Sequence, residues 1–88
     1  MNKRTNQGYT IIVSITLPDC EYVLGEKQTE SKEPQYVTWC CLNGSDYYHG
    51  HYIQDATNAR LDLYERAQRD IGYRINSLNE QIKGVCNE

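Results

Sequence analysis

Apolar and polar side chains alternate along two stretches near the start of the chain, which is the pattern of half-buried strands. Residues 9–17 read YTIIVSITL, with an apolar side chain at every second position, and this predicts a strand that places them all on one face. Residues 20–24 (CEYVL) resume an extended pattern that ends at Gly25, and Pro18-Asp19 supplies turn chemistry. We therefore expect the first two strands to form a hairpin.

A second hairpin is predicted between residues 36 and 53. The segment 36–42 (YVTWCCL) is β-branched and aromatic, and 47–53 (YYHGHYI) is its return strand. Between them, Asn43-Gly44-Ser45-Asp46 is typical of a hairpin loop. A two-residue loop and a four-residue loop both remain open, and they give the same side-chain parity.

That parity divides the second hairpin into two faces. One face carries Val37, Trp39, Cys41, Tyr48, Gly50 and Tyr52. The other carries Thr38, Cys40, Leu42, Tyr47, His49 and His51. We expect the first to be the core face, because it holds the tryptophan and a glycine over which an aromatic ring can pack. The second face is then expected to point outward.

A single long helix is predicted after Asp55, which is a suitable N-cap. The expected range is 56–83, with Gly84 as the C-terminal capping glycine. Steps of three or four residues place one apolar stripe on it, made of Ala59, Leu63, Ala67, Ile71, Ile75, Leu78 and Ile82. Such a helix spans about 40 Å, and short strands cover roughly 20 Å, so we expect its end to project beyond the sheet.

The opposite helix face carries acid-base pairs at i,i+4 spacing, which are typical of a solvated surface. The pairs are Asp62 with Arg66, Glu65 with Arg69, and Asp70 with Arg74.

Together these elements predict one α+β domain over residues 1–88. We expect about four antiparallel strands in two hairpins, with the helix packed on one face, in the order β-β-β-β-α. A chain of 88 residues buries enough surface for one thin core only. Residues 1–7 are expected to form a flexible N-terminus, and 26–34 (EKQTESKEP), which is almost free of apolar side chains, to form a mobile loop.

Charge and cysteine content narrow the function classes. The formal net charge is -3 with dispersed basic residues, which disfavours nucleic acid as a partner. The apolar run at 11–17 is short and lacks a cleavage site, so we expect no signal peptide, no membrane span and a cytoplasmic location. Cysteines 20, 40, 41 and 86 are then expected to be free thiols.

One cluster has the residue types of a metal site or of a thiol enzyme. Parity puts Cys40, His49 and His51 on one face, and Cys40 beside His49 is also a nucleophile and base pair. The spacing matches no zinc motif, and so small a domain has little depth for a substrate pocket. We therefore expect no cofactor and no catalysis, and keep a small metal or thiol enzyme as an alternative.

Tyrosine is the compositional anomaly, with eight tyrosines, one tryptophan and no phenylalanine. Tyrosine favours protein interfaces, and it can also stack on bases. The predicted partner-binding residues, on the hairpin and the helix, are Tyr47, His49, His51, Tyr64, Arg66, Tyr73 and Arg74. An accessory protein that binds nucleic acid would use Tyr47, Tyr48, Tyr52, Arg60, Arg66, Arg69 and Arg74. Pairing of the helix stripe with a second copy leaves a homodimer open as well.

Residues 36–67 also carry a set of short motifs: aromatic-x-Trp, Asn-Gly-x-Asp-Tyr-Tyr, Gly-His-Tyr, and Asp-Leu-Tyr-Glu-Arg on the helix. In these the chain resembles small uncharacterised proteins of bacterial plasmids and of integrative or conjugative elements. The resemblance implies a mobile-element setting, where small acidic proteins often inhibit host defences, as anti-CRISPR proteins do. Our leading hypothesis is a non-enzymatic protein-interaction module that inhibits such a defence.

Overall fold

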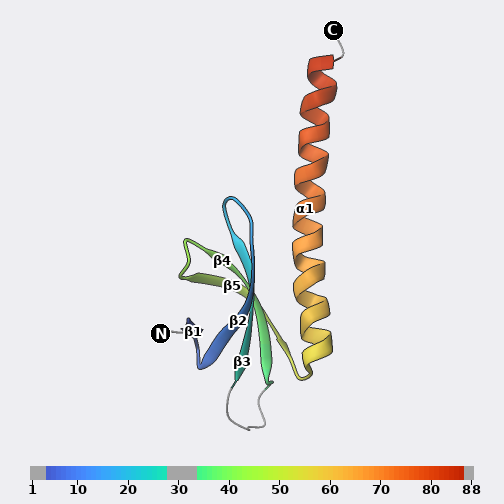
Figure 1. Cartoon of the computed structure of the whole chain (residues 1–88). Helices are drawn as coiled ribbons and strands as arrows, with labels where there is room; N and C mark the ends of the chain where they lie inside the picture. Colours follow the sequence, from blue (N-terminus) through green and yellow to red (C-terminus); the bar gives the residue numbers. More distant parts are fainter. Residues whose placement is uncertain (1–3, 28–33, 87–88) are drawn as a thin grey trace.

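The computed structural model describes residues 4–27 and 34–86, with side chains as far as Lys83. Its elements are β1 (Thr5–Asn6), β2 (Tyr9–Thr16), β3 (Glu21–Lys27), β4 (Tyr36–Leu42), β5 (Asp46–Ile53) and α1 (Ala56–Cys86). The strands form one antiparallel sheet with neighbours in chain order. The sheet is strongly twisted, and α1 lies along one side of it and runs far past its edge (Figure 1). The α+β class is confirmed, with five strands where about four were expected.

The additional strand comes from the segment expected to be a flexible N-terminus. Gln7 and Gly8 adopt φ values of 53° and 85°, and this tight turn lets Asn6 pair with Tyr9. Arg4, just before β1, reaches Glu21 on β3, with Nη1 and Nη2 donating to the two carboxylate oxygens at 3.1 and 2.9 Å. Residues 4–7 therefore take part in the fold, and residues 1–3 lie outside the described residues.

The predicted mobile loop at 26–34 is described only at its ends. Glu26 and Lys27 are the last residues of β3, while 28–33 lie outside the described residues. Strand β3 also continues through Gly25, where we expected it to end.

The β4–β5 hairpin has a three-residue loop, so the expectation of two or four residues is wrong. Leu42 pairs with Asp46, and Asn43 and Gly44 both have positive φ, at 57° and 76°. An odd loop length reverses the parity, because side chains alternate with a period of two. Tyr47 therefore pairs with Cys41 and Tyr48 with Cys40, and their predicted faces are exchanged.

A β-bulge in β5 restores the predicted parity. Between the pairs Thr38 with His51 and Cys40 with Tyr48, strand β5 contributes one residue more than β4. His49 has a φ of 55° there, as expected for a bulge residue in the left-handed region. Beyond the bulge the predicted faces of the hairpin are correct.

Strand β2 has a bulge as well, and it divides the alternating pattern between the two faces of the sheet. Ile11 pairs with Gly25 and Val13 with Leu24, with Ile12 as the extra residue. Ile11 consequently packs with the cluster of Tyr9 on one face, and Val13 packs against the helix side. The prediction that all these apolar residues share one face is wrong.

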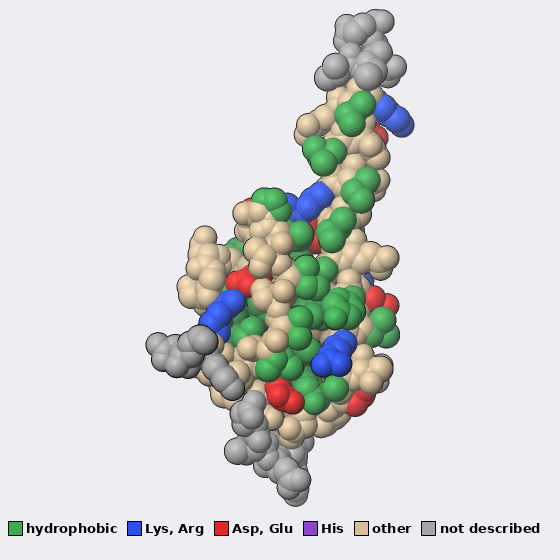
Figure 2. All heavy atoms as spheres, viewed as in Figure 1, with side chains coloured by type: hydrophobic (Ala, Val, Ile, Leu, Met, Phe, Trp, Pro, Cys, Tyr) green, Lys and Arg blue, Asp and Glu red, His purple; other side chains and the backbone are tan. Residues whose placement is uncertain are grey.

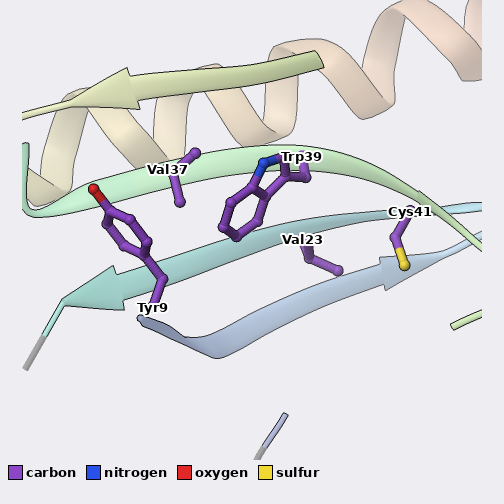
Figure 3. Close-up of a cluster of buried hydrophobic side chains, with 5 residues drawn as sticks. All are labelled: Tyr9, Val23, Val37, Trp39 and Cys41. Atoms are coloured by element: carbon purple, nitrogen blue, oxygen red, sulfur yellow. The ribbon is translucent and has the colours of Figure 1, made fainter. Parts of the chain in front are cut away.

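The first core lies on the sheet face that α1 does not cover. Its buried side chains lie together on this face over β2, β3 and β4, with Tyr9, Val37 and Trp39 converging at one end (Figure 3). Tyr9 meets Trp39 edge to face, with 5.9 Å between the ring centroids, and Tyr47 meets Trp39 at 5.3 Å. The buried members are Tyr9, Val23, Val37, Trp39 and Cys41. This is the predicted core face, although the helix lies on the other side.

The second core lies between the sheet and α1. It joins Leu24 to Ala59 and Leu63 of the helix, with Val13, Ile15, Tyr22, Tyr36 and Ile53 packed around them. Thr38, on the face predicted to point outward, is completely buried here. That prediction is wrong because it is this face that receives the helix.

Helix α1 begins as predicted and ends later than predicted. Asn58 donates its backbone N–H to Asp55 Oδ2 at 3.0 Å, which is the N-cap bond, and this bond holds the pKa of Asp55 below its usual value. The helix continues through Gly84 to Cys86. Gly84 is therefore not the capping residue.

The apolar stripe of α1 is not one face. Each four-residue step overshoots the 3.6-residue turn by about 40°, so the stripe drifts around the helix. Ala59, Leu63 and Ala67 are buried against the sheet, whereas Ile71, Ile75, Leu78 and Ile82 are exposed.

A buried polar network holds the sheet side of α1. Arg66, only 8% exposed, donates from Nη1 to the backbone oxygen and to Oγ1 of Thr38, both at 3.0 Å. Thr38 in turn donates to Asp62 Oδ2 at 2.5 Å. Asp62 and Arg66 thus meet through Thr38 and not as the predicted solvated pair.

The other two predicted pairs have different outcomes. Asp70 and Arg74 form the predicted ion pair. Glu65 and Arg69 form none within the part of the chain that the structure describes.

Replacing the buried Arg66 by alanine should lower the stability of the fold far more than replacing a charged residue on the exposed side of α1. Arg66→Ala leaves the Thr38 oxygens without their buried donor, so we expect the free energy of unfolding to fall by about 2–4 kcal/mol. Urea unfolding followed by Trp39 fluorescence at fixed protein concentration measures it. Glu80→Ala, at an exposed helix position, is the control and should change stability by less than about 0.5 kcal/mol. Equal losses for both variants would contradict the network.

Replacing either of two glycines by alanine should change the stability of the fold, in opposite directions at the two positions. A Cβ on Gly25 would lie 2.9 Å from Tyr9 Cβ and 3.2 Å from Trp39 Cζ3, whereas one on Gly72 meets nothing within 4 Å. Gly25→Ala should therefore lose about 1–3 kcal/mol. Gly72→Ala, inside the helix, should gain about 0.5–1 kcal/mol. Thermal unfolding of the two variants measures both, and stabilisation by Gly25→Ala would show that the first core is loosely packed.

Candidate functional site

A shallow pocket of about 320 Å³ opens where the sheet meets α1. Its more buried part is made by Tyr22, Cys40, Arg66 and Asp70, and its exposed rim by His49, Arg69 and Tyr73. The lining side chains come from β3, β4 and α1, and His49 comes from the bulge of β5. We refer to these residues together as the α1–sheet pocket.

Local structure explains why these side chains converge. Tyr22 and Cys40 are direct cross-strand neighbours on β3 and β4. Arg66, Arg69 and Tyr73 follow one another at three- and four-residue steps, which places them on one side of a helix. The bulge at His49 then turns an additional side chain toward them, as bulges often do near sites.

Asp70 is the electrostatic centre of the pocket wall. Arg74 donates Nε to Asp70, Tyr22 donates its hydroxyl to Asp70 Oδ2 at 2.6 Å, and these two bonds hold the pKa of Asp70 below its usual value. Burial and the neighbouring Asp70 raise the pKa of Tyr22. Arg74 also pairs with Asp19 of the β2–β3 turn at 2.6 Å. The Asp70 charge is thus compensated within the fold.

The remaining charges make the pocket basic. The Arg66 guanidinium lies 5.8 Å from the centre of the Tyr22 ring, and Arg69 is exposed at the rim. Because Asp70 is bonded to Arg74 and Tyr22 and Arg66 to Thr38, a bound group would meet chiefly the exposed Arg69 guanidinium beside the aromatic rings. This favours an acidic or aromatic group over a cation.

Two of the described thiols, Cys20 and Cys41, do not have the character of activated nucleophiles. Cys20, Cys40 and Cys41 are free. Burial and the charge of Asp70 raise the pKa of Cys20 to about 11, and burial raises the pKa of Cys41. Both thiols are therefore protonated at neutral pH, whereas catalytic cysteines have lowered pKa values. The side chain of Cys86 lies outside the described residues.

The structure brings together three of the predicted partner-binding residues and separates the others. His49, Arg66 and Tyr73 line the α1–sheet pocket. Tyr47 lies in the first core on the other sheet face. Tyr64 precedes Tyr73 by nine positions, or two and a half helical turns, so it points to the opposite side of α1.

His51 and Arg74 are each paired with carboxylates of the same chain. His51 Nδ1 lies 2.9 Å from Asp62 Oδ2, and Arg74 is held by Asp70 and Asp19. Neither lines the pocket. Tyr22, Arg69 and Asp70 line the pocket but were not among the predicted partner-binding residues. Arg69 and Asp70 could have been predicted, because their spacing from Arg66 and Tyr73 places them on the same side of the helix. Tyr22 could not, because its position beside Cys40 depends on the β3–β4 register.

The weak metal candidate is separated as well. Cys40 and His49 share the pocket, but His51 is bound to Asp62. Over residues 4–27 and 34–83, no group of three or more His, Cys, Asp and Glu side chains is placed to hold a metal ion.

Comparisons of the chain with protein-family models, with curated proteins and with solved structures gave no match. Within the described residues, no helix combines the length and the hydropathy needed to cross a membrane.

The lowered pKa of Asp70 makes part of the stability dependent on pH. A carboxylate with a depressed folded-state pKa stabilises the fold above its unfolded-state pKa of about 3.9, and the contribution disappears as the pH falls through the folded-state value. We expect Asp70→Asn to lose about 1–2 kcal/mol at pH 7. The gap to the unmodified chain should narrow as the pH falls through the lowered folded-state pKa of Asp70. Urea unfolding of both proteins at several pH values measures it, and a gap independent of pH would contradict the Asp70 contacts.

Proposed function

We propose that the chain is a small non-enzymatic protein-binding module and that its partner is held at the α1–sheet pocket. The observation that carries the proposal is His49, an exposed side chain with a φ of 55° in a β-bulge at the pocket rim. Backbone outliers of this kind cost free energy and concentrate at functional sites. Here the bulge turns an imidazole toward a basic, aromatic pocket.

The dimensions of the pocket support a protein partner. A volume of about 320 Å³ is at the lower end for small-molecule sites, and it suits a single anchoring side chain. Tyrosine and arginine, which dominate interface hot spots, are the main lining residues. The pocket chemistry selects an aspartate, a glutamate or an aromatic residue as the anchor.

The resemblance of residues 36–67 to proteins of mobile elements supports a narrower role. We propose that the partner is a component of a bacterial defence system and that binding inhibits it, in the cytoplasm of the host cell. The net charge of -3 agrees with a protein partner better than with nucleic acid. Of the arginines in the nucleic-acid alternative, Arg66 is buried and Arg74 is in two ion pairs.

A site-specific photocrosslinker tests the binding surface. We expect benzoylphenylalanine at position 73 to crosslink one partner protein in host cells, and the same group at Tyr52 not to. Tyr52 is similarly accessible, at 49% exposed against 69% for Tyr73, but it points to the other sheet face. With that partner purified, His49→Ala and Tyr73→Ala should each weaken binding at least tenfold, or about 1.4 kcal/mol or more.

The inhibitory role has its own readout. Expression of the chain in a strain with an active defence system should raise phage plating, and Tyr73→Ala should abolish the increase while Tyr52→Ala retains it. Salt-sensitive binding of a labelled oligonucleotide, unaffected by Tyr73→Ala, would support the nucleic-acid alternative and refute the protein partner.

A further inference from the structure

A continuous line of apolar side chains runs along α1 on a side that the sheet does not cover. Figure 2 shows hydrophobic groups in this line up to the projecting end of the helix. They are 39–57% exposed, although large apolar patches are uncommon on monomeric proteins. We call this line the α1 seam; its residues are Leu61, Tyr64, Ile71, Ile75, Leu78 and Ile82.

The spacing of the seam is a heptad repeat. The residues follow at steps of 3, 7, 4, 3 and 4 along the sequence, and Gln68 falls at the position that divides the step of seven. They therefore occupy positions a and d, with Leu61, Gln68, Ile75 and Ile82 at a, and Tyr64, Ile71 and Leu78 at d. A repeat of 3.5 residues is the pattern by which one helix packs lengthwise on another.

The seam is distinct from both faces already described. At about 100° per residue, it lies roughly a quarter turn from Leu63, which faces the sheet. Tyr73 of the α1–sheet pocket lies on the opposite side of α1 from Tyr64 of the seam. A helix docked on the seam therefore leaves the pocket open.

The end of α1 has little support from its own chain. Within the described residues, the last ion pair between α1 and the rest of the fold joins Arg74 to Asp19 of the β2–β3 turn, and Pro18 lies beside Ser77 and Leu78. Beyond this point the helix projects alone (Figure 1). Gly72, just before this point, weakens the helix by up to about 1 kcal/mol. Short helices without tertiary contacts are marginal in water, so a partner along the seam stabilises this end.

We propose that a second copy of the chain occupies the seam and that the two α1 helices form a parallel two-stranded coiled coil. In a parallel pair each a residue faces its own counterpart. Ile75 and Ile82 at a, with Leu78 at d, are the combination that favours two parallel strands. Gln68 at a fixes the register, because a polar side chain at this position prefers to face its counterpart.

Charges beside the seam support the same arrangement. Arg60 and Glu65 occupy positions g and e, five residues apart, so in a parallel pair each Arg60 faces Glu65 of the second copy. Within the described residues neither forms an ion pair in its own chain. The sheets, a quarter turn from the seam, lie on opposite sides of a parallel pair and do not collide.

Sedimentation equilibrium tests the proposal on the full chain. We expect a species of twice the 10.2 kDa chain mass at tens of micromolar. The variant Ile75→Asp with Leu78→Asp should weaken association at least 100-fold, because it places four carboxylates in two successive apolar layers of the pair. The control Asn76→Asp with Ser77→Asp adds the same charge next to the seam residues but outside the seam, and it should remain dimeric. Trp39 fluorescence, far from the seam, verifies that each variant is folded.

The outcomes separate this proposal from the proposed function. Tyr73→Ala should stay dimeric while it loses partner binding, and Ile75→Asp with Leu78→Asp should keep the crosslink from position 73. A monomeric unmodified chain across the micromolar range, or a dimer that survives both seam aspartates, would overturn the coiled coil.

Orientation has a separate test. Under mild oxidation, Ile75→Cys should form a disulfide-linked dimer well beyond the level of the unmodified chain with its native thiols, since residue 75 faces itself only in a parallel pair. Absence of that dimer, from a chain that sediments as a dimer, would overturn the parallel arrangement.

Discussion

One buried guanidinium, that of Arg66, determines how the helix sits on the sheet. Few apolar side chains of α1 are fully buried, and the helix would otherwise have little to fix its rotation. A buried charge is tolerated only where its donors are satisfied, and Thr38 provides two acceptors at a position that the β4–β5 register defines. Once Arg66 points to Thr38, the pocket residues are brought to the sheet edge and the α1 seam is turned away from it.

The sheet itself has to bury both faces with a single helix available. It does so through its twist and two bulges, which send apolar residues to each face. Because Ile12 adds one residue to β2, Tyr9 reaches the aromatic core and Val13 the helix core. The bulge at His49 has a second effect, since it corrects the parity that the three-residue loop reversed. The same residue lies at the rim of the pocket, so the irregularity that keeps the hairpin in register also builds the site.

Local signals were sufficient for the class of fold, and they failed where one residue changes the parity. Asp55 as N-cap, the hairpin at 36–53 and the projecting helix could all be predicted from neighbouring residues. The bulge at Ile12 could not, because its extra residue is apolar and leaves the alternating pattern intact. For the site, residue type indicated His49, Arg66 and Tyr73. Their convergence depends on the rotation of the helix about its axis, and the buried Arg66 fixes this rotation. Charged side chains usually lie in solvent, so nothing in the sequence indicated that this arginine would be buried.

The drift of the helix stripe, in contrast, was implicit in the sequence. Steps of four exceed the turn of an α-helix, so residues spaced like Ala59, Leu63, Ala67 and Ile71 rotate steadily around its axis. Such a helix can bury its first turns on its own sheet and present later turns to another surface. In the proposed pair of helices the α1–sheet pocket lies on the side of each α1 away from the seam. Two copies would then present two pockets that face apart, so the proposed partner binding and the proposed self-association would not compete for the same surface of α1.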